Sequence, residues 1–475
     1  QEIIERDKVV VQEGSKSVGM AGEWRGISLG KACSKIGSGA TPRGGKEAYL
    51  GGDTALIRSQ NIYNDRFVHD GLVFIDNKQA DELKNVVVEK GDVLLNITGD
   101  SVARCCQVDA DVLPARVNQH VAIIRPNAEV LDAAFLRYSL VSPSLQAHLL
   151  ALASAGATRN ALTKTMIESL SIAAPSITEQ RAIAHILGTL DDKIELNRRR
   201  NQTLEAMTRA LFKDWFVDFG PVRAKIEGRE PYLPADLWQH FPDRLDDEGK
   251  PEGWGYLPFG ELLEGTIGGD WGKENAEDDH DRPVCIIRGT DIPDLASGFT
   301  GKVPTRYTSE KKLASRVLQP GDIVVEVSGG SPTQPTGRSL QVSRSMLERF
   351  SHPVACASFC RRFRPKSPAL GLLAANHLTN LYRDGGTWEY QNQSTGISNF
   401  QTRLFLEKES VLLPSSGVLD AFVSFVELIS AKTTNNESIT LSQLRDTLLP
   451  KLLSGELRIK DAGKLMERAE CRTAS

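Results

Sequence analysis

The chain has 475 residues, which is too long for a single hydrophobic core and predicts two or more domains. Its 40% apolar and 25% charged residues are typical of a soluble protein, and no apolar run approaches the ~20 residues that span a bilayer. The net charge of −4 neither indicates nor excludes a nucleic-acid partner, because binding depends on a local basic face. The seven cysteines match no zinc spacing, so we expect reduced thiols in the cytoplasm and no metal site.

The sequence repeats itself at a constant offset of 230 residues, as in 254 − 24 and 321 − 91. The repeat pairs Trp24 with Trp254, Ile57-Arg58 with Ile287-Arg288, Asn61-Ile62 with Asp291-Ile292, Leu83 with Leu313, Gly91-Asp92 with Gly321-Asp322, and Thr98-Gly99 with Ser328-Gly329. Further along, the offset becomes 239, as in 364 − 125 and 414 − 175. Because repetition at a fixed offset marks repeated structural units, the sequence predicts two similar domains.

Each copy has the pattern of strands with a few helices. A Trp is followed by a glycine loop, at 37–42 and 265–269, and then by a β-type run that ends at Arg58 or Arg288. The Gly-Asp pairs predict turns that lead into buried strands, and another strand is expected over 119–125. Helical stretches near 133–153 and 370–382 close the two copies, so each is expected to be an α+β domain.

A long helix is predicted after each copy. Ser176 and Glu179 form a capping box at the start of the first helix, which we expect to extend to about Asp214. Seam residues then recur at spacings of 4, 3, 4 and 3, the heptad pattern of a coiled coil. The seam comprises Ile183, Leu187, Leu190, Ile194 and Asn197 in the first helix, and Phe422, Val426, Ile429, Thr433 and Asn436 in the second. The sequence thus predicts an α+β fold with two pseudo-repeated α/β domains separated by two long antiparallel coiled-coil helices. In the alternative, each helix packs on its own domain.

Polar loop tips follow the β-type run and the Gly-Asp strand of each copy. Arg, Gln and Asn side chains pair with base edges, whereas Ser, Thr and backbone N–H groups suit phosphates. The candidate DNA-binding residues are Thr41, Arg58, Ser59, Gln60, Asn61, Thr98, Asp100, Arg104, Asn118, Trp271, Lys273, Arg288, Thr290, Asp291 and Ser328. In the alternative, Arg58 and Arg288 only brace a turn. The Gly-Asp pairs are expected to determine the fold rather than to bind a ligand.

The sequence lacks convincing catalytic motifs. Residues 268–274 resemble a phosphate-binding loop, but Ile267 replaces its first Gly and Glu274 replaces its Mg²⁺-binding Ser or Thr. No His-Glu-x-x-His motif or Cys/His cluster occurs. We therefore expect no catalytic residue, metal or cofactor on this chain. Two alternatives remain: a stand-alone nuclease or methyltransferase, and a protein-assembly scaffold that binds no DNA.

Several segments resemble the signatures of one protein family. Residues 211–225, which read LFKDWFVDFGPVRAK, are similar to a link into a second domain, and residues 251–254, PEGW, are similar to that domain's start. Pro175-Ser176 with Glu179-Gln180 resembles an entry into a conserved helix. In the second copy Gly417-Val418 stand where Glu-Gln is expected. By these features almost the whole chain resembles the specificity subunits of type I restriction–modification systems.

The resemblance implies a non-catalytic subunit that binds a bipartite, asymmetric site on double-stranded DNA through two target-recognition domains. It also implies that the helices dock two adenine methyltransferase subunits, which in turn bring in restriction subunits, and that no membrane is involved. S-adenosylmethionine, ATP and Mg²⁺ would belong to those partners. The expected division is an N-terminal segment (1–22), target-recognition domain 1 (23–155), helical spacer 1 (156–216), a connector (217–250), target-recognition domain 2 (251–395), helical spacer 2 (396–460) and a tail (461–475). Helix length is expected to set the gap between the two half-sites.

Overall fold

The structure is a computed structural model that describes residues 24–463, except for 43, 45–48, 50, 65, 156–159, 331–333, 395–396 and 434. The chain forms two compact units. The first unit comprises Gln1–Asp192 together with Leu441–Ser475, and the second unit comprises Lys193–Thr440. The last part of the chain therefore belongs to the same unit as the first sequence copy. Among the described residues, no helix is both long enough and apolar enough to cross a membrane.

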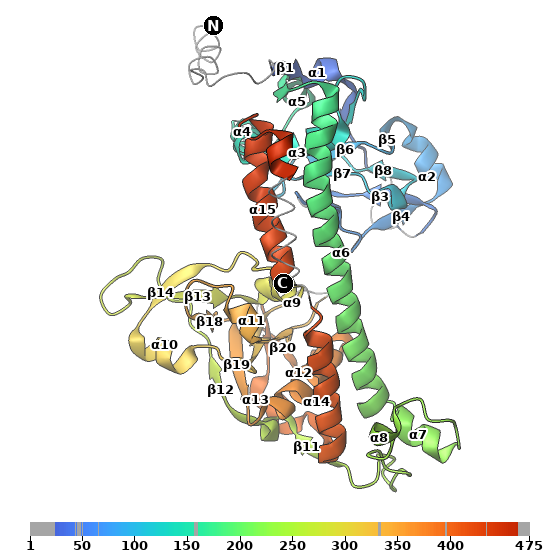
Figure 1. Ribbon diagram of the computed structural model, residues 1–475, viewed down its shortest axis with the longest axis vertical. Coiled ribbons are helices and arrows are strands. Elements are labelled where there is room, and N and C mark those ends of the chain that lie inside the picture. Colours follow the sequence, from blue (N-terminus) through green and yellow to red (C-terminus); the bar gives the residue numbers. More distant parts are fainter. Residues whose placement is uncertain are drawn as a thin grey trace. The chain divides into compact units, whose positions relative to one another are not determined.

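The first unit is built on two four-stranded sheets and a two-stranded ribbon (Figure 1). One sheet has the strand order β2 (Cys33–Ser38), β9 (Val121–Pro126), β6 (Val93–Asn96) and β7 (Cys105–Gln107), all antiparallel. The other has the order β4 (Val73–Ile75), β3 (Thr54–Ile57), β8 (Ala115–Val117) and β5 (Val87–Val88), in which β3 and β8 run parallel. The ribbon pairs β1 (Arg25–Ser28) with β10 (Ser171–Ala174). Side chains from both sheets, among them Leu56, Ile57, Leu94 and Ile123, form one buried cluster that holds the sheets together.

Several short helices accompany these sheets. The first unit contains α1 (Leu29–Ala32), α2 (Asn77–Glu82), α3 (Ala133–Val141), α4 (Pro143–Ser154) and α5 (Lys164–Ser169). The helical stretch predicted over 133–153 is thus interrupted at Ser142, whose backbone is extended. Pro143 lacks the N–H that would continue α3, but its fixed φ suits the first turn of a new helix.

The second unit repeats this topology. Its larger sheet has the order β12 (Leu263–Gly268), β19 (Cys360–Pro365), β15 (Ile323–Glu326) and β17 (Ser339–Gln341). A second sheet has the order β14 (Thr305–Thr308), β13 (Arg282–Ile287) and β18 (Val354–Cys356), with β13 and β18 parallel. The ribbon pairs β11 (Gly255–Pro258) with β22 (Ser410–Leu413). A further small sheet of β16 (Ser328–Gly329), β21 (Ile397–Phe400) and β20 (Gln391–Ser394) was not expected from the sequence.

The helices of the second unit include a connector as well as the covering helices. The connector holds α7 (Gly220–Ile226) and α8 (Ala235–Trp238). The others are α9 (Ile292–Ala296), α10 (Glu310–Arg316), α11 (Arg344–Leu347), α12 (Pro368–Arg383), α13 (Thr402–Lys408) and α14 (Ser416–Ser430). The helix predicted near 370–382 corresponds to α12.

The repeated Gly-Asp turns are held by the same ion pair in both units. Asp92 is fully buried, and its two carboxylate oxygens accept bonds from Nε and Nη2 of Arg125 at 2.7 and 2.8 Å. In the second unit, Arg364 donates the same two bonds to Asp322, both at 2.8 Å. A bidentate guanidinium–carboxylate pair is directional and strong when it is shielded from water. The structure thus explains why the Gly-Asp motif recurs together with a distant Arg-Pro pair, Arg125-Pro126 and Arg364-Pro365, which repeats at the offset of 239.

In both units, a glycine of the glycine loop lies very close to the backbone at the end of a neighbouring strand. A Cβ atom on Gly39 would overlap the carbonyl oxygen of Val117, and one on Gly269 would overlap that of Ala357. Gly39 and Gly269 are separated by the repeat offset of 230 (269 − 39). Any larger residue would force these loops away from the neighbouring strand ends.

The first long helix is continuous, whereas the second is not. α6 runs over Ile177–Phe216, 40 residues, and the Ser176 hydroxyl accepts a bond from the Glu179 N–H at 3.3 Å. The second helical segment consists of α14 followed by α15 (Asn435–Leu453). Thr433, predicted to lie in the seam, is instead exposed in the turn between them, and its hydroxyl donates to the Ser430 carbonyl at 2.9 Å. A run of Thr and Asn favours such a break, because short polar side chains compete for backbone groups.

Within each unit, the helices run antiparallel, as predicted. In the second unit, Phe212 of α6 packs against Phe422 of α14 with ring centroids 5.9 Å apart, and Asn197 of α6 bonds to Glu437 of α15. The two contacts are 15 residues apart in both segments (212 − 197 and 437 − 422). The higher number in α6 pairs with the lower number in the second segment, so the two segments run antiparallel. In the first unit, Asp191 of α6 bonds to Arg445 of α15.

The apolar seam is buried over most of its length. Ile183, Leu187, Leu190 and Ile194 of α6 are at most 8% exposed, and Asn197 is 2% exposed. Phe422 and Val426 are buried on α14, and Ile429 is half-buried. The side chain of Asn436 lies outside the described part of the chain.

Candidate nucleic-acid interface

The β-type run of the first unit ends in a turn that Asn61 holds together. β3 leads into a short 3-10 helix, Ser59–Asn61. Asn61 is fully buried; its Oδ1 accepts the Arg58 N–H at 3.0 Å, and its Nδ2 donates to the carbonyls of Val68 and Asp70. These bonds use the carbonyl oxygen and both N–H groups of the amide, so Asn61 shapes the turn.

Arg58 lies across the same turn. Its Nη2 donates to the Gly71 carbonyl at 2.6 Å, and the guanidinium lies 5.8 Å from the centre of the Tyr49 ring. Gln60 also donates to that carbonyl, at 3.2 Å, but its side chain is exposed. The structure therefore gives Arg58 a bracing role and leaves Gln60 at the tip.

The second unit has the same turn with different side chains. The 3-10 helix Gly289–Asp291 follows Arg288, and the buried Asp291 accepts the Arg288 N–H at 3.0 Å. Arg288 also donates Nε and Nη2 to Asp291 and a further bond to the Lys302 carbonyl at 2.8 Å. Thr290 is exposed at the tip. Arg288 and Asp291 are thus occupied with each other, and Thr290 is the counterpart of Gln60 (290 − 60 is again 230).

Three segments of the first unit converge on this turn. The Asn118 N–H donates to the Ile57 carbonyl at 3.0 Å, Nδ2 of the fully buried Asn96 donates to the Ser59 carbonyl at 2.9 Å, and the Ala40 N–H donates to the Val117 carbonyl. Asn118 itself is 8% exposed and accepts the His120 N–H. The backbone thus brings Thr41, which is exposed, to the same end of the unit as Gln60.

The loop after β6 carries the other candidate residues of the first unit. The Thr98 hydroxyl forms a 2.6 Å bond with Nδ1 of His120, and Asp100 is exposed. The Arg104 guanidinium lies 4.7 Å from the centre of the half-exposed Tyr63 ring, and that of Arg66 lies 5.6 Å from it. Tyr63, Arg66 and His120 were not among the predicted site residues. Their signal in the sequence is an aromatic or imidazole ring beside arginines in a polar loop, a pattern that favours stacking on bases.

The second unit presents a different arginine–aromatic stack. The Arg306 guanidinium lies 4.7 Å from the centre of the Trp271 ring, and it also forms a 3.1 Å ion pair with Glu274. Lys273 is exposed and pairs with Glu277 at 2.9 Å. Ser328 donates to Asn399 at 2.7 Å. Arg306 was not predicted, and Trp271 stands where the first unit has Thr41 (271 − 41 is 230).

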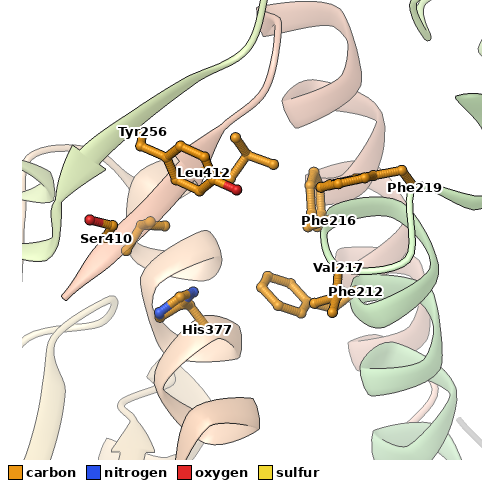
Figure 2. A pocket seen from close by; sticks show the side chains of 9 residues that line it. Phe212, Phe216, Val217, Phe219, Tyr256, His377, Ser410 and Leu412 are labelled. Atoms are coloured by element: carbon orange, nitrogen blue, oxygen red, sulfur yellow. The ribbon is translucent and has the colours of Figure 1, made fainter. Parts of the chain in front are cut away.

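An apolar cavity of about 260 Å³ lies elsewhere in the second unit. Figure 2 shows Phe212 and Phe216 of α6 and the nearby Phe219 on one side, facing Tyr256, Leu412 and His377. His377 Nε2 is held by Glu409 at 2.6 Å. No predicted site residue lines this cavity. In the described part of the chain, no group of three or more His, Cys, Asp or Glu is arranged to hold a metal.

Comparisons with known proteins agree with this organisation. Residues 22–206 match the family described as the type I restriction modification DNA specificity domain. The chain is 26% identical over 488 residues to the specificity subunit of the type I restriction enzyme HindI from Haemophilus influenzae, an alignment that covers 92% of this chain and 100% of that protein. It is 25% identical over 451 residues to the MjaIX specificity subunit of Methanocaldococcus jannaschii, covering 91% and 93%.

Among solved structures, the chain is similar to the S subunit of a type I restriction–modification system from M. genitalium, with 16% identity, a TM-score of 0.47 and coverage of 92% of this chain and 98% of that one. The similarity to the HsdS subunit from Thermoanaerobacter tengcongensis has 16% identity, a TM-score of 0.33 and coverage of 94% and 100%. Residues 22–206 thus match the type I restriction modification DNA specificity domain, and two specificity subunits of type I restriction enzymes align with this chain over nearly their whole lengths.

Proposed function

We propose that the chain is a non-catalytic subunit that reads a bipartite, asymmetric site on double-stranded DNA, with one half-site for each unit. One observation supports this most strongly: the two units share a framework but present different residues on it. The shared framework is the Gly-Asp turn with its arginine and the 3-10 turn at Asn61 or Asp291. The residues that differ at equivalent positions are Thr41 against Trp271 and Gln60 against Thr290.

The exposed residues of each tip are the proposed contacts. In the first unit these are Thr41, Gln60, Asp100 and the Tyr63–Arg104 stack; in the second they are Thr290, Lys273 and the Trp271–Arg306 stack. Polar side chains read base edges, and an aromatic ring with an arginine suits both stacking and phosphate contact. Asn61, Asn118 and Asp291 are left out of the contact set, because they are buried and bonded to the chain itself.

The partners are proposed on the basis of the family. The helices α6, α14 and α15 would dock two adenine methyltransferase subunits and, through them, restriction subunits. S-adenosylmethionine, ATP and Mg²⁺ would be bound by those partners, in the cytoplasm where the DNA lies. Helix length would then set the gap between half-sites, and removing one heptad from each long helix should shorten the preferred gap in a methylation assay on a spacer-length series.

The function is tested by DNA binding of the reconstituted complex. A gel shift at increasing salt should show a sequence-specific component that exceeds binding to random DNA, with affinity falling as salt rises. The pure chain incubated with DNA, Mg²⁺ and labelled S-adenosylmethionine should neither cut nor methylate. Catalysis by the pure chain would favour a stand-alone enzyme, and a complex that assembles without binding DNA would favour a scaffold.

A further inference from the structure

A buried ion pair in the first unit connects the helix pair to the domain that packs against it. Arg137 of α3 is 9% exposed, and its Nη1 donates to Oδ2 of Asp191 on α6 at 2.6 Å. The Tyr138 hydroxyl donates to the same oxygen at 2.6 Å, and Arg445 of α15 donates to Oδ1 at 2.9 Å. The Asp191 carboxylate is only 18% exposed, and a carboxylate so shielded from water keeps its charge when it is paired and bonded in this way. Asp191 therefore joins three helices of the unit at one point.

The other side of Arg137 reaches the loop that carries Tyr63. Its Nη2 donates to the carbonyl of Asn64 at 3.1 Å. The Asn64 side chain in turn accepts the Cys105 N–H at 2.9 Å and donates to Gln146 at 3.3 Å. Arg137 thus spans from the spacer helix to the residue next to Tyr63, and Asn64 continues the connection to the residue next to Arg104.

These bonds hold the backbone next to Tyr63 and next to Arg104, whose guanidinium lies over the Tyr63 ring. Arg104 follows Ala103, which has a φ of 69°, an unfavourable conformation for a residue with a Cβ. Gln146 Nε2 donates to the Ala103 carbonyl at 2.8 Å and so helps to hold that conformation. The stack is half-exposed, but both of its backbone supports are bonded to buried groups that lead to Asp191.

Among the described residues of the second unit, the equivalent positions make other bonds. The positions equivalent to Arg137 and Tyr138 are Asn376 and His377 (376 − 137 and 377 − 138 are both 239). Asn376 bonds to the Leu372 carbonyl within its own helix, and His377 pairs with Glu409. The link from α6 to a candidate contact loop through a buried arginine is therefore a feature of the first unit.

We propose that Arg137 and Asp191 are positioning residues that set the geometry of the Tyr63–Arg104 stack, so that recognition of one half-site depends on how α6 and α15 pack in the first unit. The proposal rests on the proposed DNA-reading function. It predicts an asymmetry: damage to this ion pair weakens discrimination at the first unit's half-site and leaves the other half-site unaffected. A partner that tightens or loosens the helix pair would change the same half-site.

The test compares Asp191→Asn, Asp191→Glu and Glu195→Gln in the full chain and in the complex with methyltransferase subunits. Glu195 is the matched control, because it lies on α6 one turn further along and pairs only with Arg198 and Arg199 of its own helix among the contacts described for it. Amide hydrogen exchange is measured over 62–66 and 101–107. Binding is measured on DNA altered in one half-site at a time.

Asp191→Asn is expected to speed exchange at the Cys105 amide by about tenfold and to reduce discrimination at one half-site by about tenfold, the effect of losing a charge-assisted bond. Asp191→Glu should restore part of both, and Glu195→Gln should change neither. If Asp191→Asn does not fold, Tyr138→Phe removes a single donor and should act in the same direction with a smaller effect.

Unchanged exchange at Cys105 in a folded Asp191→Asn chain would overturn the link. Faster exchange with equal losses at both half-sites, or with no loss at either, would overturn the positioning of one half-site. A wild-type complex without any sequence preference would instead contradict the proposed function, and the exchange measurement would still decide whether the link exists.

Discussion

Asn197 of α6 donates a 2.9 Å hydrogen bond to Glu437 of α15, and this polar pair interrupts the apolar seam of the second unit. Asn197 is 2% exposed, and Lys193 lies 3.5 Å from the other oxygen of Glu437. Polar groups at core positions of a coiled coil reduce its stability but fix its register, because a shifted pairing would leave them unbonded. The contact therefore explains how α6 keeps one register with the second helical segment, although that segment is interrupted between α14 and α15.

The pair should behave as a register device rather than as a source of stability. Asn197→Leu or Glu437→Leu alone is expected to destabilise the chain by about 1–3 kcal/mol, because each removes their hydrogen bond and leaves a polar atom of the other residue without it. The double variant should recover most of that loss, since an apolar pair replaces both polar groups. A double-mutant cycle by chemical denaturation measures the coupling, and additive losses would show that the two side chains do not act together.

Each of the ion pairs Asp92–Arg125 and Asp322–Arg364 should stabilise mainly the unit that contains it. Asp92→Asn is expected to cost about 3 kcal/mol by leaving Arg125 without its bidentate partner, and Asp322→Asn should do the same for Arg364. Hydrogen exchange resolves the effect by region. Protection should fall over β6 and β9 in the first variant and over β15 and β19 in the second. A loss that spreads equally over both units in each variant would contradict this assignment.

These pairs also show what the sequence reveals. The recurrence of Gly91-Asp92 and Arg125 at fixed offsets predicted a shared framework, and the structure shows its bidentate pair. The break at Thr433 escaped prediction, because the heptad pattern continues through residues that prefer a turn. The bonds of Asn61 and Asp291 could not be predicted for a related reason: a polar side chain in a loop suggests a surface, but here it bonds to the backbone of its own turn. Arg137 and Arg306 depend on distant neighbours that no local pattern specifies.

Variants of Arg58 distinguish two roles for this side chain: bracing the turn and contacting a phosphate. Arg58→Lys keeps the positive charge, but a single ammonium does not reproduce the reach of Nη2 to the Gly71 carbonyl. If bracing dominates, Arg58→Lys and Arg58→Ala should both weaken recognition of one half-site and leave binding to random DNA nearly unchanged. Competition binding measures this. Recovery of affinity on all sequences by the Lys variant would identify Arg58 as a phosphate contact.

Asp191 predicts an acid dependence of stability. Burial opposes its charge, but the charges of Arg137 and Arg445, together with the hydrogen bonds from Tyr138 and Arg445, outweigh burial and hold the pKa below the ordinary value of 3.8. A carboxyl group whose pKa is lower in the folded than in the unfolded chain stabilises the fold above the unfolded pKa, and that stability is lost as the pH falls through the folded pKa. The stability difference between wild type and Asp191→Asn should thus be constant near neutral pH and shrink below about pH 4. Denaturation curves across this range measure it, and a difference that grows in acid would contradict the ion pair.

The central claim, that each unit reads one half of an asymmetric site, is tested most directly by binding selection on DNA in which the two half-sites are randomised separately. The reconstituted complex is compared with Gln60→Ala and Thr290→Ala, two exposed tip residues at equivalent positions. Each variant should relax the selected sequence in one half-site only, a different half for each, by about 1–3 kcal/mol of discrimination at the affected position. Relaxation of the same half-site by both variants, or of neither, would contradict the claim.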